Sequence, residues 1–404
     1  MFFCIYTLIW SLVLLIVKAA IALRLKPQWR LYERIHFPQK KERGSLWFHC
    51  ASLGEAKGVR GLLGEITLPA NINIITTAST TAGADYLKTA RPDNLPPERF
   101  MTHVAPLDHP KVLKKFLRAY RVIALILYEM ELWPNTINLC TNRQIPILLV
   151  SARLSNRAKK IYGLLPQTFT STLNHFDWIQ AQDKENTFRI QTYTKTPVRR
   201  GTDFKAAYFL KHSFEHPIQQ KQTSTFSFVS LHLRELKILM QILPGLMNTQ
   251  RVIILPRYQE EMKDFVQLLQ PFGIEQSFNY IPGQSHLLIT EKGHVMECLN
   301  KSRFCFVGGS LIPNGCHNLW EPLTCQNEIS FGPHFDNQEY LAHKLLDAKL
   351  ASVINRPEDL LNRKNIVNSR EKIESLICEI QKDIKTASRA VEQKLKALLP
   401  IHNY

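Results

Sequence analysis

The sequence lacks a second long apolar run: of its 404 residues, only the N-terminal segment is long and apolar enough to cross a membrane. A polytopic membrane protein is therefore excluded. The sequence also lacks the biased amino-acid composition of disordered, collagenous and coiled-coil chains, because 45% of its residues are hydrophobic and 21% are charged. Since single cores stop growing at roughly 250–300 residues, we expect two domains.

The eight cysteines show no C-x-x-C pair and no repeated spacing. This absence argues against a zinc site and against a disulfide framework. Cys305 lies inside an apolar run. We therefore predict buried, reduced thiols, as in a cytosolic protein.

Acidic residues are in deficit, since 34 Asp and Glu stand against 51 Lys and Arg, which gives a formal net charge of +17. Such an excess indicates an anionic partner: nucleic acid, an acidic membrane surface or a phosphorylated substrate. Part of the charge can also serve solubility alone. The common nucleic-acid signatures, such as aromatic residues interleaved on a basic strand, are missing, so we expect no nucleic-acid partner.

No Lys or Arg precedes the apolar segment Phe2–Val17, whereas a secretory signal peptide has a basic start. Basic residues follow it instead, at Arg24, Lys26, Arg30, Arg34, Lys40, Lys41 and Arg43. The positive-inside rule then places the bulk of the chain in the cytoplasm. We predict an uncleaved anchor over residues 1–25, with the basic cluster of residues 24–43 against anionic lipid. Because Lys18 can extend to the interface, a helix lying in one leaflet is an alternative.

Candidate strands alternate with helical segments in two blocks, which is typical of parallel sheets. The first block has Ser45–Cys50, Asn71–Thr77, Phe100–Ala105, Val122–Glu129, Ile145–Ala152 and Trp178–Gln182. The second has Thr225–Ser230, Arg251–Pro256, His286–Thr290, Phe304–Gly308 and Glu328–Phe331. Residues 205–225 are charged and rich in Gln, Ser and Thr, and we predict a linker there. The domains are then 26–204 and 226–404, the second ending in an amphipathic helix near 370–399.

Ligands of doubly wound sheets bind at the carboxyl ends of the strands, so the residues after each strand are the candidates. Glu55 follows the first strand at the start of a helix, whose positive end favours an ionised carboxylate, a candidate general base. A helix-capping glutamate is the alternative. Glu131 follows the fourth strand beside Trp133. Arg153 follows the fifth strand, where it could pair with a carboxylate or a phosphate.

Polar residues also follow strands of the second block, namely Ser230, His232 and Arg257. The turn Gly308-Gly309-Ser310 follows another strand. Two glycines and a hydroxyl before a helix predict a phosphate cradle of backbone N–H groups. Glu321, a little beyond this turn, is placed to accept hydrogen bonds from ribose hydroxyls.

Five motifs, in this order, closely resemble the 3-deoxy-D-manno-oct-2-ulosonic acid (Kdo) transferases of Gram-negative bacteria. They are Ser52-x-Gly54-Glu55, Glu131-Leu132-Trp133-Pro134-Asn135, Ala152-Arg153-Leu154-Ser155, Phe306-Val307-Gly308-Gly309-Ser310-Leu311 and Gly315-x-His317-Asn318-x-x-Glu321. The resemblance extends from the N-terminal segment to about residue 340. It implies an α/β GT-B fold, with two Rossmann-like domains and a cleft between them.

The resemblance also implies a reaction: transfer of Kdo from CMP-Kdo to a lipid A precursor, lipid IVA, at the cytoplasmic face of the inner membrane. Transfer would invert the anomeric carbon without a metal or another cofactor, and the sequence has no Asp-x-Asp of metal-using sugar transferases. By position, Glu55 matches the catalytic base, and Glu131 and Arg153 lie on the acceptor side or stabilise the transition state. The donor-side residues are Ser230, His232, Arg257, Gly308, Gly309, Ser310, Asn318 and Glu321.

The donor half departs more from the family pattern than the acceptor half. The family's Lys-Phe-Asp is here Asp203-Phe204-Lys205, its Pro-Arg-His is Pro256-Arg257-Tyr258, and its Gly-Gly-His-Asn carries Cys316 for the second glycine. Three alternatives are therefore kept open. The chain could be another membrane-associated GT-B enzyme with a different nucleotide sugar, a transferase-like scaffold without activity, or a non-enzymatic basic protein that binds membrane or nucleic acid.

Overall fold

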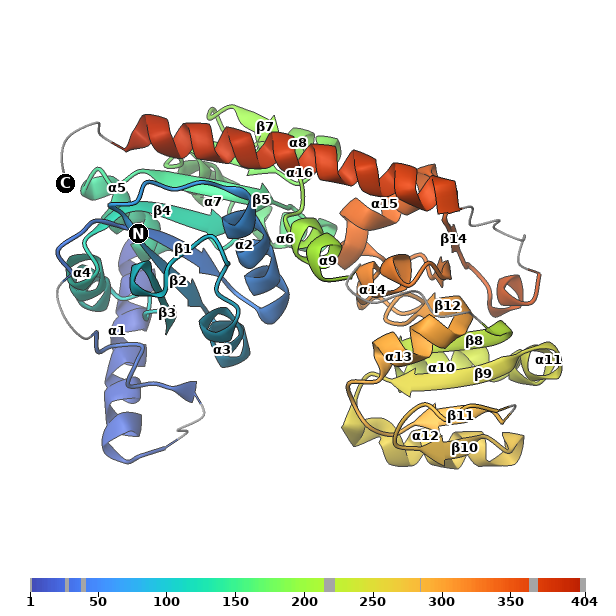
Figure 1. Cartoon of the computed structure of the whole chain (residues 1–404). Helices are drawn as coiled ribbons and strands as arrows, with labels where there is room; N and C mark the ends of the chain where they lie inside the picture. The colour runs from blue at the N-terminus through green and yellow to red at the C-terminus, as the bar shows by residue number, and fades with distance from the viewer. Residues whose placement is uncertain are drawn as a thin grey trace. The chain divides into compact units, whose positions relative to one another are not determined.

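The computed structural model describes residues 2–25, 29–37, 41–213, 222–283, 285–362 and 370–399 (Figure 1). They fall into two compact units: unit 1 comprises Met1–Tyr208 and Gln381–Tyr404, and unit 2 comprises Phe209–Ile380. Each unit contains one seven-stranded sheet whose strand pairs are all parallel. The predicted α/β architecture with two parallel sheets is therefore confirmed.

The sheet of unit 1 has the strand order β3-β2-β1-β4-β5-β6-β7. Its strands are β1 (Ser45–Cys50), β2 (Asn73–Ala78), β3 (Phe100–Val104), β4 (Val122–Tyr128), β5 (Ile147–Ala152), β6 (Trp178–Ala181) and β7 (Val198–Arg200). The central strands are almost wholly buried, as a parallel sheet covered on both faces requires. The order reverses between β1 and β4, and such a switch point is where doubly wound sheets bind ligands.

The helices of unit 1 begin where the sequence supplies caps. They are α1 (Phe2–Ala22), α2 (Leu53–Glu65), α3 (Thr81–Thr89), α4 (Pro110–Ala119), α5 (Pro134–Asn142), α6 (Asn156–Tyr162), α7 (Pro166–Leu173) and α8 (Lys184–Gln191). Ser52, Thr80 and Asp183 accept backbone hydrogen bonds at the starts of α2, α3 and α8. Proline stands in the first turn of α4, α5 and α7, where its missing N–H is not needed.

Two apolar layers form the core of unit 1. Successive residues of β1 point to opposite faces of the sheet, so Phe48 belongs to one layer and Trp47 to the other. The layer that contains Phe48 also includes Val391 and Leu395 of α16 (Arg370–Leu398), the long terminal helix drawn in red in Figure 1.

The sheet of unit 2 has the order β10-β11-β9-β8-β12-β13-β14, with its switch point between β8 and β12. Its strands are β8 (Gln222–Leu231), β9 (Arg251–Pro256), β10 (Glu275–Ser277), β11 (Leu287–Ile289), β12 (Ser302–Val307), β13 (Glu328–Phe331) and β14 (Ala351–Val353). The remaining helices are α9 (Lys205–Ser213), α10 (Leu233–Leu239), α11 (Leu243–Thr249), α12 (Met262–Leu269), α13 (Val295–Lys301), α14 (Trp320–Thr324) and α15 (Glu339–Asp347). Phe226, Phe228 and Phe306 lie at the centre of the core.

Two predicted boundaries need correction. Residues 205–225 are not an irregular linker: α9 covers Lys205–Ser213, β8 begins at Gln222, and residues 214–221 lie outside the described part. Ala206 and Leu210 of α9 are buried in the structure. The sequence did not indicate a helix here, because the many polar residues around these two favoured a linker. The terminal helix forms as predicted, but its residues from Gln381 onward belong to unit 1.

Three strands of three residues each, β7, β10 and β14, were not predicted, because so short a run shows no periodicity. The prediction for cysteine is confirmed at Cys50, Cys140, Cys298, Cys305, Cys316 and Cys325, which are buried free thiols. Cys4 and Cys378 are free but exposed, which the sequence did not indicate.

Helix α1 is long and apolar enough to cross a membrane, and 11% of its most apolar window is buried. A signal sequence or a core helix would pass the same test of length and composition. It is therefore a candidate anchor, and of the basic cluster of residues 24–43, Lys26 and Lys40 lie outside the described residues.

Candidate active site

Three carboxylates gather at the switch point of unit 1. Glu55 lies in the first turn of α2, just after β1, and Glu129 and Glu131 come directly after β4. Because β1 and β4 are adjacent and parallel, the segments that follow them leave the same edge of the sheet. The structure thus brings the predicted residues Glu55 and Glu131 to one place, together with Glu129, which the prediction did not assign a role.

Glu55 forms a capping box with Ser52. Its Oε2 accepts hydrogen bonds from the backbone N–H groups of Ala51 and of Ser52 (3.3 Å), and its own N–H donates to Ser52 Oγ (3.4 Å). The hydrogen bonds expected of a helix-capping glutamate, the alternative role for Glu55, are therefore present. Burial and the charges of Glu129 and Glu131 nevertheless raise the pKa of Glu55 to about 8. This corrects the expectation of an ionised carboxylate: the helix terminus favours the anion, but burial and two neighbouring acids outweigh it.

Glu129 is buried and has a left-handed backbone, with a φ of +58°. Such a conformation is costly for a residue with a side chain, and it is concentrated at functional sites. Lys205 Nζ donates to Glu129 Oε1 at 2.6 Å, and Arg153 NH2 lies 3.5 Å from Glu129 Oε2. Burial opposes ionisation, but these two cations outweigh it and hold the pKa of Glu129 below its usual value. The predicted pairing of Arg153 with a carboxylate is confirmed.

Glu131 contacts an aromatic group on each side. Trp133 Nε1 donates to its Oε2 at 2.9 Å, and His49 Nε2 lies 3.5 Å from the same oxygen. Burial raises the pKa of Glu131, but the hydrogen bonds with His49 and Trp133 more than compensate and leave that pKa lowered. His49 is buried at the end of β1 and is fixed by Thr77, whose Oγ1 lies 2.8 Å from its Nδ1.

The segment with exchanged charges, Asp203-Phe204-Lys205, also belongs to this site. The Tyr128 hydroxyl donates to Asp203 Oδ1 at 2.8 Å, while Lys205 reaches Glu129. Burial lowers the pKa of Lys205, but Glu129 and Asp203 outweigh it, so the ammonium stays charged. The site therefore holds two anionic glutamates, stabilised by cations and hydrogen bonds, and beside them a third that holds its proton near neutral pH. That third carboxyl can exchange a proton with a bound hydroxyl group.

Unit 2 carries a row of stacked side chains at its own switch point. His232 Nε2 lies 2.7 Å from His317 Nε2, with the two rings nearly parallel at an interplanar angle of 12°. Tyr258 packs edge-on against His232, and Arg257 lies over the Tyr258 ring. Burial, Arg257 and His232 lower the pKa of His317 to about 4, so His317 is neutral at pH 7. His232 and Arg257 were predicted here, whereas His317 appeared in a motif without a role.

The predicted phosphate cradle is already filled. The wholly buried carboxylate of Glu235 accepts hydrogen bonds from the N–H groups of Gly309 (2.7 Å), Ser310 (2.9 Å) and Leu311 (2.9 Å). The expectation that these groups bind a phosphate is wrong, because they have an internal anion as their partner. The glycines are required for close packing instead: Gly309 has a φ of +75°, and a Cβ at Gly308 would lie 2.3 Å from the carbonyl oxygen of Ser230.

The remaining donor-side residues have structural contacts in the described chain. Ser310 Oγ donates to the Val307 carbonyl at 2.5 Å and accepts from the Gly332 N–H at 2.8 Å. Asn318 Oδ1 accepts from the Trp320 N–H at 3.0 Å, at the start of α14. Glu321 lies in the first turn of α14. A donor-binding role for Ser230, Asn318 and Glu321 stays a prediction.

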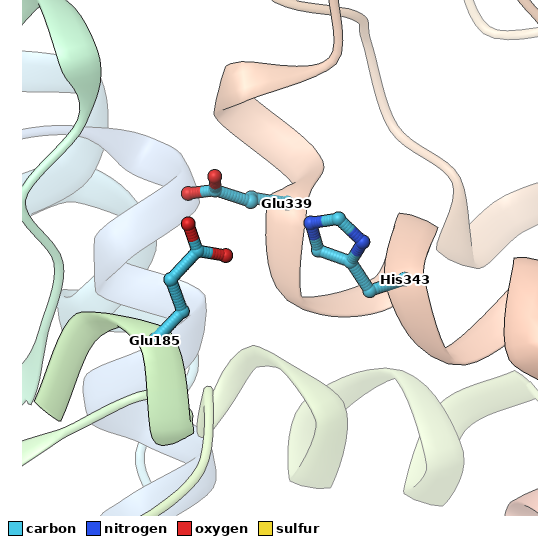
Figure 2. Close-up of side chains that lie close together, drawn as sticks. All are labelled: Glu185, Glu339 and His343. Atoms are coloured by element: carbon cyan, nitrogen blue, oxygen red, sulfur yellow. The ribbon is translucent and has the colours of Figure 1, made fainter. Parts of the chain in front are cut away.

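Figure 2 shows three side chains of types that bind metals, Glu339 and His343 on α15 of unit 2 and Glu185 on α8 of unit 1. Glu185 pairs with Arg189 on its own helix, and the His343 ring packs against Phe335. Structural zinc sites take four ligands and catalytic sites three from the protein, so two residues of one helix turn do not define a site.

Sequence reasoning missed Glu129, Lys205, His49 and Glu235. A signal was present for three of them. Glu129 stands two residues before Glu131, Lys205 lies in the motif with exchanged charges, and Glu235 follows the candidate residue His232 by three positions. None of these signals indicates the partner, because 76 residues separate Lys205 from Glu129 and 74 separate Glu235 from Gly309.

A family model described as 3-Deoxy-D-manno-octulosonic-acid transferase (kdotransferase) matches residues 29–207. A bifunctional glycosyltransferase/methyltransferase of Fusobacterium nucleatum is 24% identical over 365 residues, which cover 85% of this chain and 56% of that protein. A 3-deoxy-D-manno-octulosonic acid transferase of Haemophilus influenzae is 25% identical over 350 residues, which cover 82% of this chain and 81% of that protein.

Two solved structures share the fold. The UDP-GlcNAc 2-epimerase from Neisseria meningitidis, bound to UDP-GlcNAc, aligns with a TM-score of 0.58 and 12% identity, over 87% of this chain and 100% of that one. MurG from Acinetobacter baumannii aligns with a TM-score of 0.50 and 12% identity, over 88% and 99%. The predicted GT-B fold is therefore confirmed, and the chain is a glycosyltransferase whose sequence is similar to the 3-deoxy-D-manno-octulosonic acid transferases.

Proposed function

We propose that this protein transfers Kdo from CMP-Kdo to the lipid A precursor lipid IVA, with unit 1 acting on the acceptor and unit 2 binding the donor. The observation that carries the proposal is the buried Glu55 carboxyl beside Glu129 and Glu131, because its burial and their charges raise its pKa to about 8. A general base works best when its pKa lies near the working pH. The family supports Kdo as the transferred sugar.

In the proposed step, the acceptor hydroxyl oxygen forms a bond to the anomeric carbon of Kdo while its proton passes to Glu55. The bond between that carbon and the phosphate oxygen breaks, and its electron pair leaves with CMP. A single displacement of this kind inverts the anomeric carbon. Glu129 and Glu131 keep Glu55 basic, and the charge on Glu129 is retained by Lys205 and Arg153.

The acceptor side of the proposal is supported by an apolar pocket of about 380 Å³ next to the carboxylates. Glu131 and Trp133 line it, along with Tyr162 and Phe169 of α6 and α7. The exposed side chain of Leu165 continues this apolar surface. A lipid fits these properties, because its sugar hydroxyl would reach the carboxylates while an acyl chain occupies the pocket.

On the donor side, we propose that Arg257, His232 and His317 bind the phosphate and the Kdo carboxylate. Arg257 supplies a permanent positive charge, and the histidine pair supplies hydrogen-bond donors at neutral pH. Transfer without a metal is part of this proposal, since the leaving phosphate would be stabilised by these side chains rather than by the filled glycine turn. The reaction would take place at the cytoplasmic face of the inner membrane, with α1 as the anchor.

The test is transfer of radiolabelled Kdo from CMP-Kdo to the tetraacylated precursor by the wild type and by Glu55→Gln. We expect the wild type to transfer Kdo and E55Q to lose it by about 10²–10⁴-fold, the usual cost of removing a general base. Glu65→Gln, at the exposed end of the same helix, is the matched control and should retain the wild-type rate.

Near-normal transfer by E55Q would remove Glu55 from the role of base. Calorimetric titration with cytidine and uridine nucleotides tests the donor separately. Binding of a uridine nucleotide in preference to CMP would replace CMP-Kdo by another nucleotide sugar.

A further inference from the structure

Helix α1 is attached along unit 1 rather than projecting from it. Near its start, the Tyr6 hydroxyl donates to the buried Asp108 Oδ2 at 2.9 Å, and Thr7 Oγ1 donates to Asn135 Oδ1 at 2.8 Å. Asp108 and Asn135 stand before α4 and in the first turn of α5. These polar contacts fix one end of α1 to the α/β unit.

Apolar contacts fix the rest of the same side of α1. Leu14 and Val17 are buried in a cluster with Ile35, Leu107 and Val112. The attached side thus extends from Tyr6 to Val17, which is roughly 17 Å of helix at 1.5 Å per residue. Such a series of contacts does not leave α1 free to reorient independently of unit 1.

The opposite side of α1 is exposed and wholly apolar. Its large side chains are Ile5 (51% exposed), Leu8 (71%), Ile9 (55%), Leu12 (60%), Leu15 (63%) and Ile16 (59%). Their spacing of three and four residues keeps them on one side of the helix. A continuous exposed apolar surface of this kind marks an interaction site. Only this side of α1 is open to acyl chains, because the opposite side, which is also apolar, packs on unit 1.

A basic groove borders α1. Lys18 of α1 and Lys111 and Lys115 of α4 line a groove of about 420 Å³ whose apolar wall includes Leu14 and Val112. In the part of the chain that the structure describes, none of the three lysines forms an ion pair. Neither this groove nor the adjoining one, which shares Lys115 and adds Arg118 and Arg143, is lined by an acidic residue.

A membrane-spanning α1 is incompatible with these contacts. If α1 crossed the bilayer while attached, Asp108 and the lysines of α4 would be drawn into the hydrocarbon core, where charged groups are strongly disfavoured. A helix parallel to the surface avoids this, because its apolar side faces the acyl chains while Lys18, Lys111 and Lys115 reach the headgroup layer. The anionic groups in that layer are the phosphates of phospholipids.

We propose that unit 1 binds one leaflet of an anionic membrane with α1 parallel to its surface, and that Lys18, Lys111 and Lys115 bind phospholipid phosphates. This binding does not depend on Kdo transfer, so each can fail without the other. It assigns the α1 surface and the α4 groove a ligand, and it selects the in-leaflet alternative over a spanning anchor.

The first test is flotation of the full-length protein with phosphatidylcholine vesicles, with and without phosphatidylglycerol. Lys111→Glu/Lys115→Glu should lower binding to the anionic vesicles about tenfold or more and leave binding to the neutral vesicles unchanged. Leu12→Glu/Leu15→Glu should lower binding to both. The control Lys184→Glu/Lys195→Glu makes the same change of charge on exposed residues of unit 1 and should bind as the wild type does. Anionic-vesicle binding by K111E/K115E equal to that of this control would overturn the headgroup site.

The second test is the orientation of α1 in cells, read with a membrane-impermeant maleimide. In a Cys4→Ser/Cys378→Ser background, which removes the exposed thiols of the described chain, a single cysteine is placed at Phe2→Cys or at Leu25→Cys. A parallel helix places both ends on the cytoplasmic side, so both variants should react in inverted inner-membrane vesicles and neither in spheroplasts. Labelling of F2C in spheroplasts, or its failure to react in inverted vesicles, would overturn the parallel orientation.

Discussion

Glu55 in unit 1 and Glu235 in unit 2 occupy corresponding positions. Each is the third residue of the helix that follows the first strand of its sheet, and each accepts a hydrogen bond from the backbone N–H of the residue that caps that helix. Glu235 receives three more N–H donors from the glycine turn and is wholly buried. Glu55 lies instead beside two carboxylates, and its pKa is raised.

The difference shows that position after a strand does not determine what a carboxylate does. Backbone donors convert one glutamate into a structural anion that holds the turn of unit 2. Burial and two neighbouring acids raise the pKa of the other, so that it can exchange a proton near neutral pH. The proposed chemistry is therefore placed at Glu55, whereas the contacts of Glu235 support the fold.

The largest effect is expected from Glu235→Gln. The amide of this variant cannot accept all the N–H groups that now point at two carboxylate oxygens, and its own N–H₂ would face backbone donors. We expect a loss of about 3 kcal/mol in the stability of unit 2, as for other buried charged groups that lose their partners. Calorimetry measures the total loss, and hydrogen exchange at Gly309–Leu311 assigns it to this turn.

Glu260→Gln, an exposed change in the same unit, is the control for E235Q. It should leave the stability of unit 2 and the hydrogen exchange at the glycine turn unchanged. Unchanged exchange at the turn in E235Q would mean that the two glutamates differ less than the contacts indicate.

The next effect is the pH dependence of the wild type. A general base acts when it is deprotonated, and the pKa of Glu55 is raised to about 8. The value of kcat/KM should therefore rise with pH and level off above pH 8, falling about tenfold for each unit below it. A profile that is flat between pH 6 and pH 8 would show that another group limits the reaction.

A smaller shift is expected when the charge beside Glu55 is removed. Glu129→Gln takes away one of the two negative charges that raise the pKa of Glu55, so the acid limb of the profile should move to lower pH by about one unit. Glu65→Gln should leave the limb in place. Because E129Q also leaves Lys205 without its partner, the melting temperature is measured alongside, and only a shift in folded protein counts.

The sequence predicted most strands because buried parallel strands are continuous apolar runs, and Ser45–Cys50, Arg251–Pro256 and Glu328–Phe331 match to the residue. It also located Glu55 and Glu131 through turn chemistry after strands. It did not predict how charges pair across the sheet, since the link between Lys205 and Glu129 is tertiary. The same limit explains the phosphate cradle: a glycine turn is visible in sequence, but the anion that fills it is not.

The smallest effect is expected at His317, on the proposed donor side of unit 2. His317 can supply a hydrogen-bond donor but no charge at neutral pH, because burial and Arg257 lower its pKa to about 4. His317→Asn keeps a donor at this position, so we expect a rise in KM for CMP-Kdo of no more than about tenfold, the value of one or two neutral hydrogen bonds. Arg257→Met removes the charge and should raise KM more. If H317N instead abolished turnover without changing KM, the histidine pair would act in the chemical step, and unit 2 would hold a proton-exchanging group of its own.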